Sequence, residues 1–190
     1  MNDLEFGLKA ELPALTAPSI TETGLGKGTG DSQLHVGGEA FASYALSRRF
    51  FLTGLVGTRR RYLQWPPHED LTATAETRAL RLALGGRVSF LDPPTFVSLN
   101  VGGGWVSGWW QIQLGAAPGD LKWRGPMGYA GVQVDHFFNP HFALTGELRG
   151  WVERQGEGTI SHQDEDGVGW AFEHPGAAGG LSVLVGLTFR

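Results

Sequence analysis

The chain has 190 residues, a length that suits one domain over 1–190 and could close one small barrel. With 15 Lys plus Arg against 19 Asp plus Glu, its net charge of −4 gives no reason to expect a nucleic-acid partner. The absence of cysteine excludes disulfides and thiolate metal sites, and no apolar run approaches the roughly 18 residues that a transmembrane helix needs.

The N-terminus runs from Met1 straight into a strand-like pattern without a secretory signal segment. For an exported protein, this start indicates a mature form to which an initiator methionine has been added. Eight segments then alternate apolar and polar residues with period two, as strands with one apolar face do. In chain order they lie at about 3–12, 34–44, 50–62, 80–90, 97–105, 129–135, 142–152 and 181–189.

The connections between these segments alternate in length. Three are short, at 47–49, 92–94 and 139–141, and four are long, near 14–32, 64–76, 112–126 and 154–178. Such alternation is typical of an up-and-down barrel whose two rims differ, with short turns on the periplasmic side. The pattern predicts an all-β, antiparallel eight-stranded transmembrane barrel with short periplasmic turns, long extracellular loops and both termini in the periplasm.

A soluble ligand-binding barrel would show the same alternation with its apolar stripe inward, so the aromatic residues were used to choose between the two. Tryptophans lie toward the long connections and phenylalanines toward the short turns, which predicts the two interfacial girdles of a membrane barrel. The predicted girdle residues are Trp65, Trp105, Trp109, Trp110 and Trp151 at one end and Phe90, Phe96, Phe138, Phe142 and Phe189 at the other.

The polar stripe carries nearly balanced charges. In an eight-stranded barrel the lumen holds only side chains, so charges pointing inward have to pair. We expect an ion-pair network that plugs the lumen, formed by Glu5, Lys9, Glu39, Arg81, Arg87, Asp135, Glu147 and Arg149.

Two segments resemble a known family. Residues 131–149, from Gly131-Val132-Gln133 through Asn139-Pro140-His141 to Arg149, look like the hairpin of small outer-membrane barrels of the OmpA, OmpX and OmpW kind. The ending Gly186-Leu187-Thr188-Phe189-Arg190 is similar to their C-terminal strand, although the aromatic is next to last here. The resemblance implies a bacterial outer-membrane location and recognition of this strand by the barrel-assembly machinery.

Arg59, Arg60 and Arg61 precede the aromatic residues of a long connection. They predict a contact with lipopolysaccharide phosphates, which Arg forks suit. The alternative is a solvated strand end with one arginine pointing into the lumen. Membrane lipids and lipopolysaccharide are therefore the expected partners, together with a protein partner that the sequence does not identify.

The rest of the sequence gives little indication of a metal site or a catalytic site. The acidic stretch 161–167 lacks the ligand spacing of a calcium loop, and His35 with Glu39 lacks a convergent serine for a lipid-modifying hydrolase. We expect no metal, no cofactor and no catalytic residue. The expected function is a non-enzymatic barrel whose outer loops bind or adhere, or which anchors an assembly. The alternatives are a narrow conduit for small or hydrophobic solutes and a soluble ligand-binding barrel.

Overall fold

The computed structural model describes residues 4–12, 20–23, 26–30, 36–64, 73–90, 94–114, 117–154, 159–163, 169–173 and 177–190. All regular structure in these residues is β-strand. The strands are β1 (Leu4–Glu11), β2 (Ile20–Thr23), β3 (Gly26–Gly30), β4 (Val36–Ala45), β5 (Phe50–Gln64), β6 (Ala73–Ser89), β7 (Thr95–Leu114), β8 (Ala117–Asn139), β9 (Phe142–Arg154), β10 (Thr159–Gln163), β11 (Gly169–Glu173) and β12 (Ala177–Phe189).

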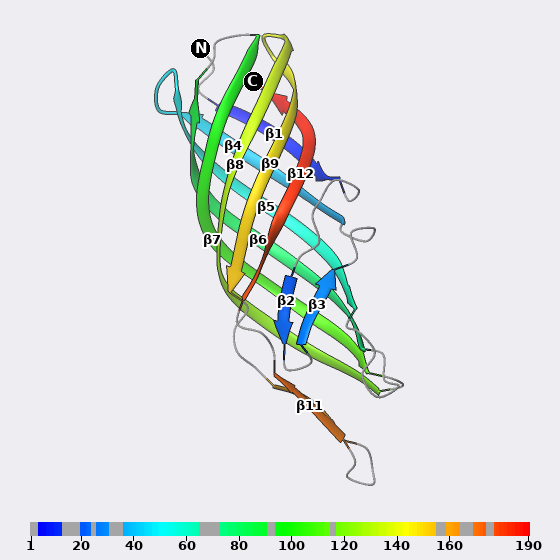
Figure 1. Ribbon diagram of the computed structural model, residues 1–190. Helices are drawn as coiled ribbons and strands as arrows, with labels where there is room; N and C mark the ends of the chain where they lie inside the picture. The colour runs from blue at the N-terminus through cyan, green and yellow to red at the C-terminus, as the bar shows by residue number, and fades with distance from the viewer. Residues whose placement is uncertain are drawn as a thin grey trace.

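Ten of these strands form one closed antiparallel sheet (Figure 1). From β5 to β9 each strand pairs with the next, β9 pairs with β12, and β12 closes the ring against β1, with Phe6 opposite Phe189. At the end of the barrel that holds the termini, β1 and β4 complete the ring. Toward the opposite end, β2 and β3 take their places between β12 and β5. Both rings therefore contain eight strands, as the alternation predicts.

Both termini lie at one end of the barrel, together with the short turns (Figure 1). We call this the terminal end and the opposite one the far end. In the β8–β9 turn the Asn139 side chain accepts a hydrogen bond of 2.9 Å from the His141 backbone N–H, across Pro140. This is the local bond by which asparagine favours turns, and it fixes the pairing of β8 with β9.

The far end differs from the sequence prediction. Residues 112–126, predicted as a long loop, are mostly strand, because β7 and β8 stay paired out to Leu114 opposite Ala117. The segments 14–32 and 154–178, also predicted as loops, contain the β2–β3 and β10–β11 hairpins. The apolar alternation fails in these segments because strands that extend beyond the hydrocarbon layer need no apolar outer face.

Side chains alternate strictly between the two faces of the wall. Leu8 on β1 is 63% exposed and Leu84 on β6 is 68% exposed, whereas Glu5 is 2% exposed and Arg149 on β9 is 3% exposed. The aliphatic stripe thus faces outward and the charged stripe faces the lumen. A soluble ligand-binding barrel would have the reverse arrangement.

Aromatic residues share the lumen with the charges. The buried cluster there consists of Phe41, Leu55, Ala79, Ala83, Val106, Trp110, Trp123, Met127, Tyr129, Trp151 and Ala178. Inward-facing glycines make room for the larger rings. A Cβ built on Gly102 would lie 2.6 Å from the Tyr129 ring, and one on Gly85 would lie 2.6 Å from its hydroxyl.

Candidate functional site

The charged lumen is the principal candidate site. Burying unpaired charges is costly, so their partners decide what the lumen can do. The described residues place twelve such side chains inside the barrel, each less than 10% exposed: Glu5, Lys9, Glu11, Glu39, Arg59, Arg61, Arg81, Arg87, Asp135, Glu147, Arg149 and Glu153. All of them except Arg81, together with Arg190, form three layers from the terminal end to the far end.

The terminal-end layer joins Glu5, Arg87, Asp135 and Arg190. Glu5 pairs with Arg87 and also accepts hydrogen bonds from the Arg190 guanidinium, whose Nη2 lies 2.6 Å from Glu5 Oε1. Arg87 Nη1 reaches Asp135 Oδ2 at 3.6 Å. Arg190 therefore adds a second, partly exposed cation beside Glu5 in this layer.

The middle layer joins Lys9, Glu39, Glu147 and Arg149. Lys9 Nζ lies 2.5 Å from Glu147 Oε2 and 3.7 Å from Glu39 Oε1. Arg149 binds Glu39 through two nitrogens and Glu147 through Nε and Nη2. Each carboxylate thus has two cationic partners, which is the arrangement that offsets the cost of burying charge.

A small internal cavity lies between these two layers. The internal cavity here has a water-accessible volume of about 10 Å³, and its walls include Lys9, Arg87 and Arg149. A volume of this size holds about one water molecule.

The far-end layer joins Glu11, Arg59, Arg61 and Glu153. Arg61 Nη2 lies 2.6 Å from Glu153 Oε1, and Arg59 Nε lies 3.5 Å from Glu11 Oε2. The Trp151 ring contacts both arginines, with guanidinium carbons 3.8 Å and 5.1 Å from its centroid. Charge pairing and cation–π contact therefore operate together in this layer.

Of the residues predicted for the ion-pair network, seven lie in the terminal-end and middle layers. Arg81 also points into the lumen and is 2% exposed, but no ion pair among the described residues includes it. The predicted network does not include Arg190 or the four members of the far-end layer, Glu11, Arg59, Arg61 and Glu153. Extending the period-two alternation of β9 by two residues beyond Trp151 would have found Glu153.

The arginine triplet is only partly placed as predicted. Arg59 and Arg61 are buried in the lumen, at 3% and 1% exposed, so their predicted contact with lipopolysaccharide is wrong. Successive residues of a strand point to opposite faces, and only Arg60 faces outward. Its guanidinium Nε lies 2.7 Å from Glu76 Oε1, and Nη2 bonds the Tyr62 hydroxyl at 2.9 Å.

Among the residues predicted for the aromatic girdles, some face outward and others face the lumen. Trp105, Trp109, Phe90, Phe138 and Phe189 are 40% or more exposed on the outer wall. Phe142 stacks on Phe138 there and contacts Phe189 with its ring tilted. The prediction was wrong for Trp110, Trp151 and Phe96, which are 0%, 4% and 8% exposed and point into the lumen. Strand parity, rather than position along the barrel, sends these rings inward. Trp65 lies outside the described residues.

The remaining candidates do not assemble a reactive site in the described part of the chain. His136 bonds Thr95 and His141 lies in a short turn, both exposed at the terminal end. Ser161 and His162 belong to β10, while His35 and residues 164–168 are outside the described residues. No group of three or more His, Asp or Glu able to hold a metal ion occurs among the described residues.

The described residues contain no helix that is long and apolar enough to cross a membrane. Neither a protein-family model nor the sequence of a curated protein matches this chain. Solved structures do match it, over nearly the whole length of both chains.

Three of these structures are bacterial outer-membrane proteins. A major outer membrane protein from Thermus thermophilus gives a TM-score of 0.56 at 13% identity, covering 98% of both chains. Ail, the attachment invasion locus protein of Yersinia pestis, gives 0.54 at 12% identity, covering 97% of this chain and 98% of Ail. The outer membrane protease OmpT from Escherichia coli gives 0.53 at 10% identity, covering 98% of this chain and 93% of OmpT. The chain has the fold of the small integral β-barrels of the bacterial outer membrane.

Proposed function

We propose that this protein is a non-enzymatic, non-conducting outer-membrane barrel whose far end presents a binding surface outside the cell. The observation that supports the proposal is the pairing of charged side chains across the lumen. Three ion-paired layers cross it from the terminal end to the far end. Removing a carboxylate or a guanidinium would leave a buried charge with fewer opposite charges beside it, so the layers resist opening.

The middle layer supports closure most strongly. Its four charged groups come from β1, β4 and β9, so the ion pairs tie parts of the wall that are far apart in sequence, such as Lys9 and Glu147. A solute passing along the axis would have to break these contacts. Porins, whose barrels have 16–18 strands, leave an aqueous channel that a barrel of eight strands lacks.

The length of the wall at the far end supports a binding role. A tilted strand crosses the hydrocarbon layer with about 9–11 residues, whereas β7 has 20 residues and β8 has 23. Their outer halves carry exposed polar side chains, among them Gln111, Gln113 and Lys122. Such a wall projects beyond the membrane and offers sheet surface to a partner or to an assembly anchored by the barrel.

The first experiment tests the proposed orientation and uses the absence of cysteine. Gln111→Cys places a single thiol at the far end, and Arg48→Cys places one in the exposed β4–β5 turn at the terminal end. A membrane-impermeant maleimide should label the Gln111→Cys variant in intact cells and the Arg48→Cys variant only after lysis. The reverse labelling would contradict an outward-facing far end.

A second experiment tests closure. Proteoliposomes containing the barrel should swell in arabinose no faster than protein-free liposomes. Rapid swelling would contradict a plugged lumen and would favour a conduit for small solutes.

A further inference from the structure

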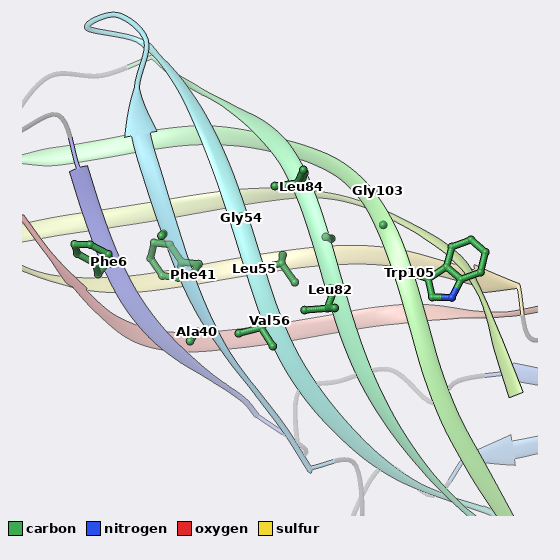
Figure 2. Close-up of a pocket in the computed structure, with 13 residues that line it drawn as sticks. Phe6, Ala40, Phe41, Gly54, Leu55, Val56, Leu82, Leu84, Gly103 and Trp105 are labelled. Atoms are coloured by element: carbon green, nitrogen blue, oxygen red, sulfur yellow. The ribbon is translucent and has the colours of Figure 1, made fainter. Parts of the chain in front are cut away.

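The outer wall carries an apolar groove that has no role in the function proposed above. The groove has a volume of about 870 Å³ and extends over five neighbouring strands, β1 and β4 to β7 (Figure 2). Its lining is Phe6, Ala40, Phe41, Ala42, Gly54, Leu55, Val56, Leu82, Ala83, Leu84, Gly103, Gly104 and Trp105. Most of these residues occupy outward positions, so the groove opens toward the lipid and not into the lumen.

Small residues create the depression and large ones border it. In the cross-strand register Phe6 lies opposite Ala42, Ala42 opposite Gly54, and Gly54 opposite Leu84, so two small residues separate two bulky ones. In the next row Val56 and Leu82 lead to Trp105 on β7, which is 53% exposed. A hydrocarbon chain packed along these rows would bury apolar surface on both sides.

The rows of the register climb toward the far end. A row that starts at Phe6 on β1 reaches Gly179 on β12 after passing round the wall, and Gly179 lies opposite Ile20 on β2. After one turn round the barrel the row therefore lies beyond the end of β1, in the part of the wall that β2 and β3 complete. Trp105 is consequently nearer to the far end than Phe6 is.

Basic residues stand directly beyond this upper end of the groove. The next outward row toward the far end runs from Thr58 through Leu80 and Ser107 to Arg124, and the row after it from Arg60 through Arg78 and Trp109 to Lys122. All four basic side chains are exposed. Apolar groove and cationic cluster are thus continuous on one side of the barrel.

Two of the four basic side chains have an acidic partner and two have no ion pair among the described residues. Arg60 and Arg78 share the carboxylate of Glu76, which leaves that trio with a net positive charge. No ion pair within the described residues engages Lys122 or Arg124. Guanidinium and ammonium groups exposed at headgroup depth, without an anionic partner, are suited to bind phosphate.

From this juxtaposition we infer a binding site for a phosphorylated acyl lipid, with hydrocarbon chains in the groove and phosphates on Lys122 with Arg124 and on Arg60 with Arg78. Two cationic pairs and a groove wider than two strands match the lipid A part of lipopolysaccharide, which carries several chains and two phosphates. The choice of this lipid rests on the proposed function, since that function places the far end in the outer leaflet.

The test measures 1:1 lipid adducts of the detergent-solubilised barrel by native mass spectrometry. The protein is titrated separately with bis-phosphorylated lipid A, with dephosphorylated lipid A and with phosphatidylglycerol. We expect the adduct with bis-phosphorylated lipid A to form at concentrations about tenfold lower than with either comparison lipid. Equal binding of the dephosphorylated lipid would overturn a phosphate site, and equal binding of phosphatidylglycerol would overturn the choice of lipid A.

Two variants test the two halves of the site, each with a matched control. Lys122→Ser with Arg124→Ser should weaken the lipid A adduct about tenfold, whereas Arg48→Ser with Arg49→Ser, in the exposed turn at the terminal end, should leave it unchanged. Ala42→Leu with Gly54→Leu should fill the groove and weaken the adduct. The control variant, Gly146→Leu with Gly150→Leu on the outer face of β9, should leave the adduct unchanged. Both positions accept a side chain, since a Cβ at Gly146 meets nothing within 4 Å and one at Gly150 makes ordinary contacts.

Boiling-dependent migration on gels verifies that each variant has folded. An adduct that survives both site variants at full strength would overturn the site. Because the assay uses solubilised protein, its failure would leave the orientation and closure experiments unaffected.

Discussion

Arg149 on β9 and Glu39 on β4 meet across the lumen, where Arg149 Nη2 lies 2.7 Å from Glu39 Oε1 and Nη1 binds the second carboxylate oxygen. Their strands are not neighbours in the sheet. The same guanidinium also binds Glu147, so one cation pairs with two buried carboxylates and Lys9 supplies the second positive charge.

Arg149→Met should therefore lower the free energy of unfolding by about 3–5 kcal/mol, because it leaves Glu39 and Glu147 sharing Lys9 alone. Urea titration of the barrel refolded in lipid vesicles, followed by tryptophan fluorescence, measures the loss. Adding Glu39→Gln should recover part of it, since one unpaired charge disappears. A loss no larger than that of Arg48→Met, at the exposed turn, would show that the middle layer does not stabilise the barrel.

Glycines facing the lumen should tolerate no side chain where a ring covers them. Gly102→Ala would place its Cβ 2.6 Å from the Tyr129 ring, and we expect a loss of about 1–3 kcal/mol from the overpacked interior. Gly86→Ala, on the outer face of β6 with nothing within 4 Å of the added Cβ, should be nearly neutral. The same urea titration compares the two, and equal stabilities would contradict the inward position of Tyr129.

A charge on the outer wall should cost stability according to its depth in the membrane. Leu148 is 53% exposed in the middle of β9, and Leu148→Arg should destabilise the barrel in vesicles by about 2–4 kcal/mol. Gln111→Arg, near the far end of β7, should cost about 0–1 kcal/mol. A neutral Leu148→Arg would mean that this face is in water.

Much of the fold is predictable from the sequence. Because one face of each strand meets lipid and the other meets charges, the alternation of Leu8 with Lys9, or of Leu148 with Glu147, reveals both the strands and their orientation. The same logic failed at the far end. There the outward residues Lys122 and Arg124 of β8 are charged and the inward residue Trp123 is aromatic, so the polarity pattern indicates a loop where the chain forms a strand.

The errors in the site have a common origin. The arginines at 59–61 were treated as a contiguous motif and the tryptophans as a band, although neighbouring residues on a strand face opposite ways. The composition of each layer could not be predicted, because it depends on the register between distant strands. Lys9 and Glu147 meet only after the ring has closed through β12.

The proposed closure of the lumen is tested most directly by single-channel recording of the natural protein in planar lipid bilayers. We predict no steady current through the natural barrel, because three ion-paired layers cross its lumen. A large and steady conductance through the natural barrel would contradict the account.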